Sequence, residues 1–396
     1  MYLYNMVYYM RPAPGGRAPS DRRILFMLYN AIKGILPQFR FEGRYVSCSE
    51  ICSGNINTTY HLVYALPDGT RREYLLQRIN GYAFKDPMAV MRNIELVTRH
   101  IQAAYEAEGV DSSRRMLQVI HTKNDSPLYC APDGSCWRVY NYIDNATAYD
   151  KIEKPEHFYE AGRAFGEFQR LLTDFPAAQL SETIPDFHNT LKRFYAFVAS
   201  VAADRAGRAA SVDDEIEFFF DRRRMMGQIV KKLESGVLPV RVTHNDTKIN
   251  NVMIDDATDK AICVIDLDTV MPGSALYDYG DAIRSGASTA AEDEEDFSKV
   301  SIDVNLFELF TRGFLSEVRG ILTPAEIEML PLSVKIITCE LAMRFLTDYI
   351  DGDLYFKVRS PEHNLIRARN QMKLLTDIEQ KYDQLTAICR DIAQNG

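Results

Sequence analysis

Residues 242–251 read Val-Thr-His-Asn-Asp-Thr-Lys-Ile-Asn-Asn, and residues 264–268 read Val-Ile-Asp-Leu-Asp. The first stretch fits the pattern H-x-D-x4-N at His244, Asp246 and Asn251, and Asp266 follows at the distance of a short hairpin. Phosphoryl transfer from a magnesium nucleotide requires a weak base near the attacking oxygen and hard oxygen ligands for the metal. We therefore expect Asp246 to accept the proton of an acceptor hydroxyl, and Asn251 and Asp266 to bind Mg²⁺.

Chance is the alternative explanation of this pattern. From ordinary residue frequencies, H-x-D-x4-N should arise by coincidence in a chain of this length on the order of a few times in a hundred. The second aspartate at hairpin distance makes coincidence rarer still. His244 precedes the base on a tight loop, and we expect it to hold that loop by hydrogen bonds rather than to act in catalysis.

Length and composition limit the kinds of protein that the chain can form. It has 396 residues, of which 46% are hydrophobic, and this fits a two-lobed globular protein with a sizeable interior. No segment is long and apolar enough to cross a membrane. The net charge of −9 argues against nucleic-acid binding, because a surface that follows phosphates needs clustered Lys and Arg. We predict a cytoplasmic protein with small-molecule partners and without membrane or nucleic-acid partners.

The cysteines and the N-terminal segment give two further expectations. The seven cysteines contain no C-x-x-C pair, so we expect free thiols in a reducing compartment. The N-terminal segment lacks a basic region before a continuous apolar core, and it does not resemble a signal peptide. Residues 1–20 are expected to form a loose extension.

Residues 45–144 carry the turn signals of β-hairpins, within a predicted first lobe that spans residues 21–144. Pro67-Asp68-Gly69 and Pro132-Asp133-Gly134 each separate two strand-like runs. Between the hairpins, apolar residues recur at helical spacing, at Val90, Ile94, Val97 and Ile101. The predicted first lobe is an antiparallel sheet interrupted by one helix, which is the layout of a nucleotide-binding kinase N-lobe.

Residues 145–396 are predicted to form a mainly helical second lobe, which makes the fold class α+β with a two-lobed, protein-kinase-like layout. Helical patterns, several opened by proline, cover residues 155–172, 213–233, 306–318, 324–350 and 361–392. Strong strand signals occur at residues 251–254 and 261–265, and the predicted metal ligands lie at their ends. The acidic run at residues 292–296 is expected to be a solvated helix start.

Longer strings extend the pattern beyond the catalytic stretch, at residues 54–60, 91–98, 137–140, 241–251, 265–269, 271–274, 277–281 and 361–365. On these strings the chain resembles the aminoglycoside-phosphotransferase branch of protein-kinase-like enzymes and, within it, the N-acetylhexosamine 1-kinases. The resemblance implies ATP as the phosphate donor and Mg²⁺ as the cofactor. It also implies that the acceptor is the C1 hydroxyl of N-acetylglucosamine or N-acetylgalactosamine, with Asp246 as the base and a sugar 1-phosphate as the product.

Two other functions compete with this one. A kinase of the same fold could act on an aminoglycoside or on another small alcohol or hexose. An aminoglycoside pocket should present several convergent carboxylates, and the C-terminal helices offer only Asp348, Asp351 and Asp353 as a group. A catalytically inactive binding protein should lack the base or a metal ligand, and all three of these residues are present.

The predicted nucleotide site draws on the first lobe. Gly54, Asn55, Asn57 and Thr58 stand where a glycine-rich loop is expected, although the segment has one glycine only. The third strand lacks the usual Lys, and Arg78 is the better candidate for the phosphate cation, with Glu95 of the helix as its partner. Gln77 on the opposite face is the competing assignment, and an exposed Arg78 on an edge strand is the structural alternative. The last strand adds two aromatic residues to the set, Tyr140 and Tyr142.

The predicted sugar pocket lies in the second lobe. Arg344 and Asp348 are one helical turn apart and share a face, so they could grip adjacent sugar hydroxyls, or they could form a plain ion pair. The resemblance favours a binding role, with Tyr355 stacking on the ring. Asp278 is expected to brace the His244 loop, while Asp281 and Arg284 are expected to line the pocket.

Overall fold

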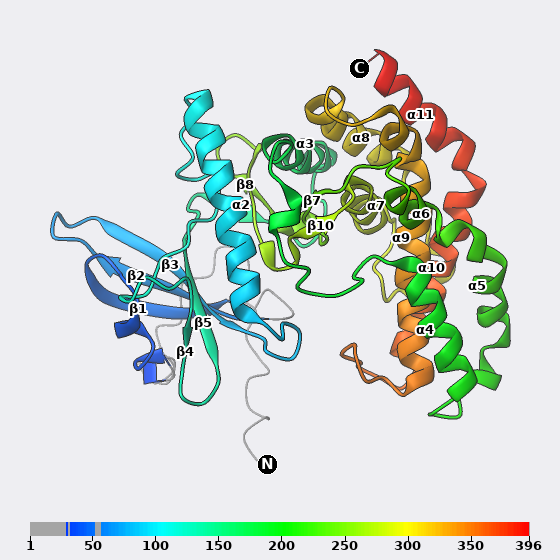
Figure 1. Cartoon of the computed structure of the whole chain (residues 1–396), viewed down its shortest axis with the longest axis horizontal. Coiled ribbons are helices and arrows are strands. Elements are labelled where there is room, and N and C mark those ends of the chain that lie inside the picture. The colour runs from blue at the N-terminus through cyan, green and yellow to red at the C-terminus, as the bar shows by residue number, and fades with distance from the viewer. Residues whose placement is uncertain (1–28, 31, 52–56, 396) are drawn as a thin grey trace. The chain divides into compact units, whose positions relative to one another are not determined.

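The computed structural model describes residues 29–30, 32–51 and 57–395, and these fall into two compact units (Figure 1). Unit 1 comprises residues up to 95 together with residues 117–144, and unit 2 comprises residues 96–116 and 145 onward. The predicted extension at residues 1–20 lies outside the described residues, as do Gly54 and Asn55.

Unit 1 is built on an antiparallel sheet with the strand order β1-β2-β3-β5-β4. Its elements are the 3₁₀ helix η1 (Leu36–Gln38), β1 (Arg44–Ile51), β2 (Thr58–Ala65), β3 (Arg71–Ile79), the start of α2 (Pro87–Glu108), β4 (Tyr129–Cys130) and β5 (Cys136–Asn141). Gly69 and Gly134 take positive φ angles of 87° and 82°, which the tight turns of the two predicted hairpins require. The antiparallel sheet and the interrupting helix that were predicted for the first part of the chain are therefore confirmed.

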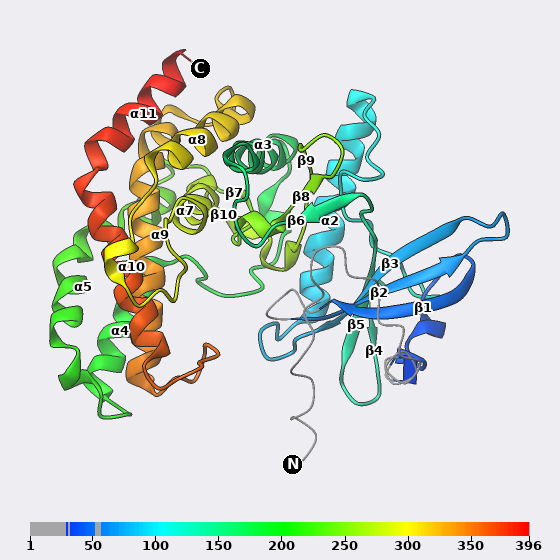
Figure 2. The same cartoon turned by 180° about the vertical axis from the view of Figure 1, so that it is seen from behind.

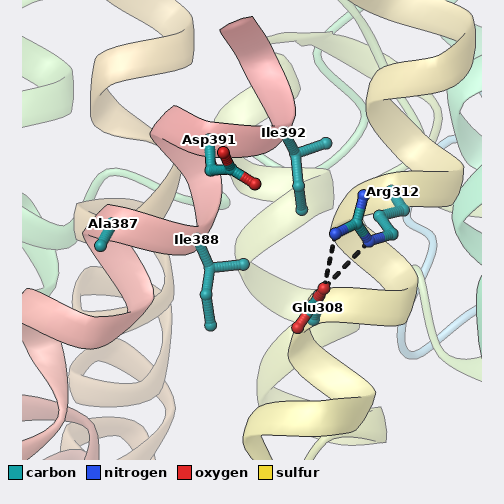
Figure 3. A pocket seen from close by; sticks show the side chains of 6 residues that line it. All are labelled: Glu308, Arg312, Ala387, Ile388, Asp391 and Ile392. Carbon is teal, nitrogen blue, oxygen red and sulfur yellow. Dashed lines mark hydrogen bonds and ion pairs between the residues drawn. The ribbon is translucent and has the colours of Figure 1, made fainter. Parts of the chain in front are cut away.

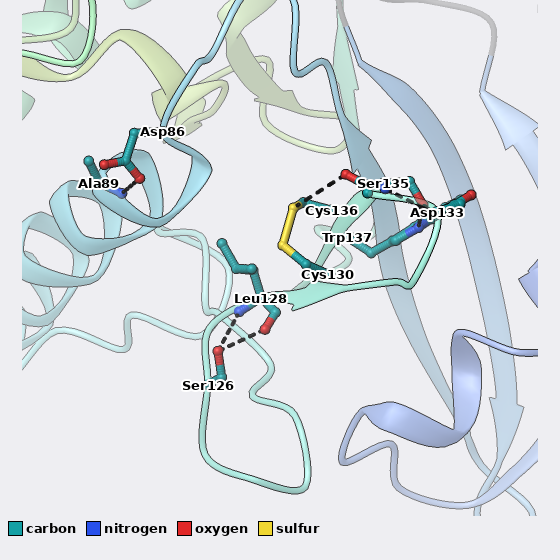
Figure 4. Close-up of a disulfide and its surroundings, with 10 residues drawn as sticks. Asp86, Ala89, Ser126, Leu128, Cys130, Asp133, Ser135, Cys136 and Trp137 are labelled. Carbon is teal, nitrogen blue, oxygen red and sulfur yellow. Dashed lines mark hydrogen bonds between the residues drawn. A yellow bond between two sulfur atoms is a disulfide. The ribbon is translucent and has the colours of Figure 1, made fainter.

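The described part of unit 1 contains a disulfide between Cys130 and Cys136 (Figure 4). These two residues face each other in the β4–β5 register, and their Cα atoms are 4.1 Å apart. The expectation that the cysteines are free thiols is wrong for this pair, because the hairpin register, which C-x-x-C spacing does not test, brings them together. Cys48, Cys263, Cys339 and Cys389 are free and buried.

Unit 2 combines two small sheets with a set of helices (Figure 2). One sheet has the order β6-β8-β9, and the other pairs β10 with β7. The strands are β6 (Ala146–Ala148), β7 (Arg241–Thr243), β8 (Val252–Asp255), β9 (Ala261–Val264) and β10 (Met271–Gly273). The helices are α3 (Pro155–Leu171), α4 (Thr190–Ala203), α5 (Asp213–Met226), α6 (Gln228–Glu234), α7 (Ala275–Gly286), α8 (Val304–Val318), α9 (Pro324–Asp351), α10 (His363–Gln380) and α11 (Tyr382–Asn395). Short 3₁₀ helices occur at η2 (Ala177–Gln179), η3 (Ala209–Ser211), η4 (Ile249–Asn251), η5 (Leu267–Thr269) and η6 (Phe297–Lys299).

Close helix packing forms the frame behind the catalytic stretch. A Cβ atom on Gly162 of α3 would lie 2.3 Å from the Phe310 carbonyl oxygen of α8, and one on Gly313 of α8 would lie 2.1 Å from the Tyr159 carbonyl oxygen. A Cβ on Gly280 of α7 would lie 2.8 Å from the Ser333 carbonyl oxygen of α9. Larger side chains would push these helices apart, so Gly162 and Gly313 allow α3 to lie close to α8, and Gly280 allows α7 to lie close to α9.

Several helix boundaries differ from the sequence prediction. The predicted helix 213–233 divides at Gly227 into α5 and α6, and 361–392 divides near Lys381 into α10 and α11. The acidic run 292–296 is not a helix start, and its conformation is irregular with turns. Among the described residues, none of the helices has the length and apolar character needed to cross a membrane.

Candidate active site

The catalytic stretch leaves β7 in a sharply bent conformation that hydrogen bonds hold on both sides. Thr243 at the end of β7 donates its hydroxyl to the Met271 carbonyl of β10 at 2.9 Å. Asn245 has a φ of 65°, a left-handed conformation that Asn tolerates, and its side-chain amide donates to the Thr269 carbonyl at 2.8 Å. The loop is therefore fixed to β10 and to the segment that follows Asp266.

Asp278 of α7 holds the same loop through hydrogen bonds to its backbone. Its carboxylate accepts the backbone N–H groups of His244 at 3.0 Å and Asn245 at 2.7 Å, and the side-chain amide of Gln169 at 2.8 Å. Burial raises the pKa of Asp278, while the nearby His244 and these donors oppose the rise. This geometry agrees with the bracing role expected for Asp278.

The His244 ring is buried and uses both nitrogens inside the loop. Nε2 lies 2.9 Å from the Ile265 carbonyl oxygen, which can only accept, so Nε2 carries the hydrogen. Nδ1 is then an acceptor, and the Asp246 backbone N–H donates to it at 3.3 Å. The ring links the segment of the base to the segment of Asp266, as its expected structural role requires.

Asp246, Asn251 and Asp266 come from three neighbouring segments of unit 2. The Asn251 side-chain amide donates to the Asp246 backbone carbonyl at 2.8 Å and to its Oδ2 at 3.3 Å. Because the amide nitrogen is engaged, the Asn251 side-chain oxygen is the atom of this group that could accept a metal ion, as the sequence predicts. Asp266 has a left-handed backbone with a φ of 58°, and the preceding Ile265 N–H donates to the Asn251 carbonyl at 2.9 Å.

The donor set fits a magnesium ion that keeps several non-protein ligands. Asn251 and Asp266 supply an amide and a carboxylate oxygen, which are hard ligands of the kind that Mg²⁺ prefers. Among the described residues there is no group of three or more His, Cys, Asp and Glu that could hold a metal by itself. Nucleotide phosphates and water would therefore complete the coordination.

Lys248 is a residue of this loop that the sequence analysis did not single out. Its Nζ lies 2.8 Å from Oδ1 of Asp246, and its side chain is about half exposed. The neighbouring Asp246 carboxylate raises the pKa of Lys248, although partial burial opposes the rise. Its position in the sequence, two residues after the expected base, could have indicated that it lies near Asp246.

A chain of charged groups runs from the catalytic loop to α10. The Thr247 N–H donates to Asp281 at 3.1 Å, and Arg284 donates to the same carboxylate at 2.8 Å. Arg284 also pairs with Glu292 at 3.2 Å, and Arg367 of α10 pairs with Glu292 at 2.5 Å. Burial would raise the pKa of Asp281, but Arg284 and then Lys248 hold it below its ordinary value.

This network changes two sequence expectations. Arg284 is 4% exposed at its side chain and is held by two carboxylates, so it supports the loop rather than facing an acceptor. Glu292 belongs to the acidic run that was expected to be solvated, yet it is bound between Arg284 and Arg367. The neighbouring Asp293 pairs with Arg359 at 3.0 Å. The run is a set of ion-pair partners because two helices present arginines to it.

Arg344 lies on α9 among aromatic rings. Its guanidinium carbon is 5.6 Å from the centre of the Phe187 ring, 5.8 Å from that of Tyr355 and 5.5 Å from that of Phe356. Within the part of the chain that the structure describes, Arg344 has no hydrogen bond or ion pair. Phe356 also faces Arg367 at 5.2 Å, which places the Arg344 group next to the charged network.

Asp348 does not pair with Arg344, although the two residues share a helix face. Its carboxylate accepts the backbone N–H groups of Leu354 at 2.8 Å, Tyr355 at 2.7 Å and Phe356 at 2.9 Å, and the Asn364 amide at 2.8 Å. The predicted grip on sugar hydroxyls by Asp348 is replaced by a structural role, because the loop after α9 folds back over its carboxylate. Tyr355 itself is 60% exposed.

His188 borders the same aromatic group and was also missed. Its Nδ1 lies 2.9 Å from a carboxylate oxygen of Glu340, and its ring centre is 4.6 Å from that of Phe187. The other nitrogen, Nε2, is buried and has no partner among the described residues. Burial would raise the pKa of Glu340, but His188 and Arg193 lower it below its ordinary value.

The residues of unit 1 that were predicted to bind the nucleotide differ from one another in their surroundings. Asn57 accepts the Asn80 N–H at 3.0 Å, and Thr58 begins β2. Tyr140 is buried with its hydroxyl 3.9 Å from the Met91 sulfur, and Tyr142 stacks on His61 with ring centres 4.3 Å apart.

Arg78 is exposed, and its predicted pairing with Glu95 is wrong. Glu95 lies 2.6 Å from His121 Nε2 instead. The reason is strand parity. Arg78 points to the same side of β3 as the buried Leu76, whereas α2 packs against the other side, where Gln77 and Arg138 meet.

A surface pocket in unit 2 lies away from these residues. It is formed between α8 and α11, by Glu308, Arg312, Ala387, Ile388, Asp391 and Ile392 (Figure 3). None of the residues predicted for catalysis or for binding of the acceptor lines this pocket. Two of its lining residues, Arg312 and Glu308, form an ion pair at 2.7 Å.

Solved structures of low sequence identity share the fold. An aminoglycoside phosphotransferase from Alicyclobacillus acidocaldarius matches with a TM-score of 0.56 at 14% identity, over 98% of this chain and all of that one. A microcompartment-associated aminopropanol kinase matches with a TM-score of 0.59 at 14% identity, over 90% of this chain and 98% of that one. The amicoumacin kinase hAmiN, in complex with AMP-PNP, Ca²⁺ and Ami, matches with a TM-score of 0.56 at 13% identity, over 92% of this chain and 97% of that one.

The two-lobed kinase-like fold class is thereby confirmed. At the level of sequence, residues 47–298 match the model of the phosphotransferase enzyme family, and this range is more than half of the chain. The range contains the predicted catalytic loop, both predicted metal ligands and all of the sheet of unit 1 except the first three residues of β1. The chain belongs to the phosphotransferase enzyme family.

Proposed function

We propose that the protein is an ATP-dependent kinase that phosphorylates the C1 hydroxyl of an N-acetylhexosamine, N-acetylglucosamine or N-acetylgalactosamine. Membership of the phosphotransferase family supports the type of reaction. The sequence resemblance supports the sugar. The observation that carries the proposal within the structure is Arg344, a cation without a hydrogen bond or ion pair in the described chain, set among three aromatic rings.

In this reaction Asp246 accepts the proton as the acceptor oxygen attacks the terminal phosphorus of ATP, the bond from that phosphorus to the bridging oxygen breaks, and ADP leaves. Lys248 at 2.8 Å and the Asn251 amide at 3.3 Å fix the orientation of the carboxylate. The positive charge of Lys248 also stabilises the negative charge on the phosphoryl group during its transfer. Asn251 and Asp266 would hold a magnesium ion, which would neutralise part of the phosphate charge.

The acceptor side suits a neutral sugar with polar substituents. Aromatic rings stack on the apolar face of a sugar, and Phe187, Tyr355 and Phe356 surround Arg344. The Arg344 guanidinium offers donors to hydroxyl and acetamido oxygens. His188 Nε2 adds a buried polar atom beside Phe187.

A polycationic acceptor such as an aminoglycoside fits these surroundings less well. The carboxylates that could receive it already have partners in the chain. Asp348 accepts four donors, Asp351 accepts the Ser200 hydroxyl at 2.9 Å, and Asp353 pairs with Arg208 at 2.6 Å. Arg344 would also repel a cation. We therefore rank an aminoglycoside or another small alcohol second.

The test is a product assay on a panel of free sugars with ATP, including matched pairs with and without the 2-acetamido group, and aminoglycosides. We expect turnover with N-acetylhexosamines and a product that has lost its reducing end, because a 1-phosphate blocks the anomeric carbon. A product that still reduces would place the phosphate elsewhere on the ring. Turnover with aminoglycosides alone would favour the second candidate.

A further inference from the structure

A row of three polar side chains crosses the sheet of unit 1 from strand to strand. The antiparallel registers place Thr59 of β2 opposite Gln77 of β3, and Gln77 opposite Arg138 of β5. The Gln77 amide nitrogen donates to the Thr59 hydroxyl at 3.1 Å, and Arg138 Nε donates to the Gln77 amide oxygen at 2.9 Å. We call these three residues the Thr59–Gln77–Arg138 row.

The row lies on the face of the sheet that α2 covers. Arg138 Nη1 is 3.9 Å from the Met91 sulfur of α2, and the Arg138 guanidinium lies 5.0 Å from the centre of the Tyr140 ring. The opposite face carries the apolar core of the unit, with Tyr60, Leu76 and Trp137. Arg138 is 1% exposed, so a permanent positive charge is buried beneath this face.

A buried guanidinium is costly unless its surroundings use its charge. Its bond to the Gln77 oxygen is charge-assisted, and such a bond polarises the amide group that accepts it. The Gln77 amide has two hydrogens, and Thr59 receives one of them. The second hydrogen is a donor strengthened by the charge behind it, on a residue that is partly exposed.

The row also adjoins the described end of the predicted phosphate-binding segment. Asn57 and Thr58 run directly into Thr59, and Asn57 is tied to the end of β3 through the Asn80 N–H at 3.0 Å. A phosphate bound by Asn57 and Thr58 would therefore be near Gln77. Arg78 cannot take this role from its own position, since adjacent strand residues point to opposite faces.

We propose that Gln77 donates an amide N–H to a phosphate of the nucleotide and that Arg138, acting through Gln77, supplies the positive charge that the third strand lacks. The pair takes the place of the cation expected at Arg78. Gln77 is then a binding residue and Arg138 a positioning residue. This inference rests on the proposed function in one respect, because it takes a nucleoside triphosphate as the phosphate donor.

The test compares the binding of ATP with that of adenosine by calorimetry, with and without Mg²⁺, in the full-length chain. Gln77→Met keeps the length of the side chain and removes its donors, so ATP should bind about tenfold or more weakly while adenosine binding changes less than about twofold. Arg138→Lys keeps the charge and should retain part of the ATP affinity that Arg138→Met loses. Arg78→Met is the matched control on the other face and should bind ATP like the wild type.

Equal losses for ATP and adenosine would assign the row a purely structural role and overturn the inference, as would a loss of ATP affinity in Arg78→Met alone. If Arg138→Met does not fold, Gln77→Met and Arg138→Lys still decide the matter. If Gln77→Met binds ATP with the affinity of the wild type, the phosphate-binding role of the Thr59–Gln77–Arg138 row is overturned, while the proposed function is not affected. Failure of the wild type to bind ATP would instead contradict the proposed function itself.

Discussion

At the scale of single residues, the conformation of the loop around Asp246 is determined by a small number of hydrogen bonds, which the sequence pattern already implies. A tight bend after β7 needs an acceptor for two backbone N–H groups, and Asp278 supplies it. It also needs a residue that tolerates positive φ, and Asn245 supplies that. We propose that the side chains that follow these supports, Asp246 and Lys248, act on the acceptor and the phosphates.

Asp246→Asn removes the proposed proton acceptor and keeps the shape of the side chain. General-base assistance is worth about 10² to 10⁴ in rate, so kcat should fall by that order while ATP affinity changes little. The measurement is steady-state turnover together with calorimetric ATP binding. Asp256→Asn, at an exposed aspartate of the β8–β9 turn, is the control. Near-normal turnover of Asp246→Asn would remove the residue from its assigned role.

Asp266→Ala removes the carboxylate proposed to bind the metal. We expect loss of activity at ordinary Mg²⁺, because a hard charged ligand is absent. Asn251→Ala removes a neutral ligand and should shift the Mg²⁺ dependence of the rate to higher concentration. A magnesium titration of initial rates checks both variants. Unchanged magnesium dependence in the two variants would mean that the metal is held elsewhere.

Sequence reasoning failed for single residues where one position decides the face of a strand. Arg78 was preferred to Gln77 for its charge, but a shift of one residue along a strand moves a side chain to the other side of the sheet. The sequence does not show that Arg138, 61 residues away, would supply the charge to Gln77. Arg344 and Asp348 share a face as expected, yet the partners of Asp348 come from a loop whose path no pattern predicted.

At the scale of secondary-structure elements, the turns were predictable and some helices were not. Both Pro-Asp-Gly turns form because glycine alone takes the needed φ without strain. Helix α7 was missed although Asp278, Asp281 and Arg284 recur at helical spacing, because all three charged residues are buried and bind other parts of the chain rather than forming a solvated face. The disulfide was missed because its cysteines meet through strand register rather than through a short motif.

The acidic segment after α7 should make stability depend on pH. Burial would raise the pKa of Glu292, but Arg284 and Arg367 lower it below its ordinary value. A carboxylate whose pKa is lower in the folded state than in the unfolded state stabilises the fold at pH values above its unfolded pKa, which is near 4.3 for Glu. This stabilisation is lost as the pH falls through the folded-state pKa. Glu292→Gln should therefore lower the Tm at neutral pH, and the difference from wild type should shrink below about pH 4.

Thermal unfolding of wild type and Glu292→Gln between about pH 3 and pH 7 measures this effect. Glu295→Gln, at an exposed position of the same run, is the control and should change the Tm little at any pH. A Tm difference that stays constant with pH would mean that the charge of Glu292 does not stabilise the fold.

Asp348 should be needed for stability rather than for acceptor contact. Asp348→Ala leaves three backbone N–H groups and the Asn364 amide without their acceptor, and we expect a loss of at least about 3 kcal/mol in the free energy of unfolding. Urea unfolding measures it. Asp351→Ala removes one hydroxyl contact and should lose about 1 kcal/mol or less. Unchanged stability with weakened sugar binding would restore the substrate role.

At the scale of the whole molecule, the two-lobed, kinase-like fold class followed from the sequence, but the extent of each compact part did not. The predicted first lobe, residues 21–144, contained all of α2, whereas residues 96–116 belong with unit 2. Two side-chain contacts within unit 2 agree with this division. His100 lies 2.9 Å from Asp174, and Glu108 lies 2.6 Å from Arg170 of α3. Such partners cannot be read from the helix itself.

The division into units predicts that donor and acceptor binding can be changed separately. Arg344 is in unit 2, while the Thr59–Gln77–Arg138 row is in unit 1. If Arg344 binds a hydroxyl or acetamido oxygen of the sugar, Arg344→Ala loses roughly 1 to 3 kcal/mol, which raises the KM for the sugar by about 5- to 150-fold. The KM for ATP should stay nearly constant. Arg312→Ala, which breaks the exposed Glu308 pair on α8, is the control in the same unit and should leave both constants unchanged. Equal increases in both KM values for Arg344→Ala would indicate a general disturbance of the fold, and no increase in either would take Arg344 out of the acceptor site.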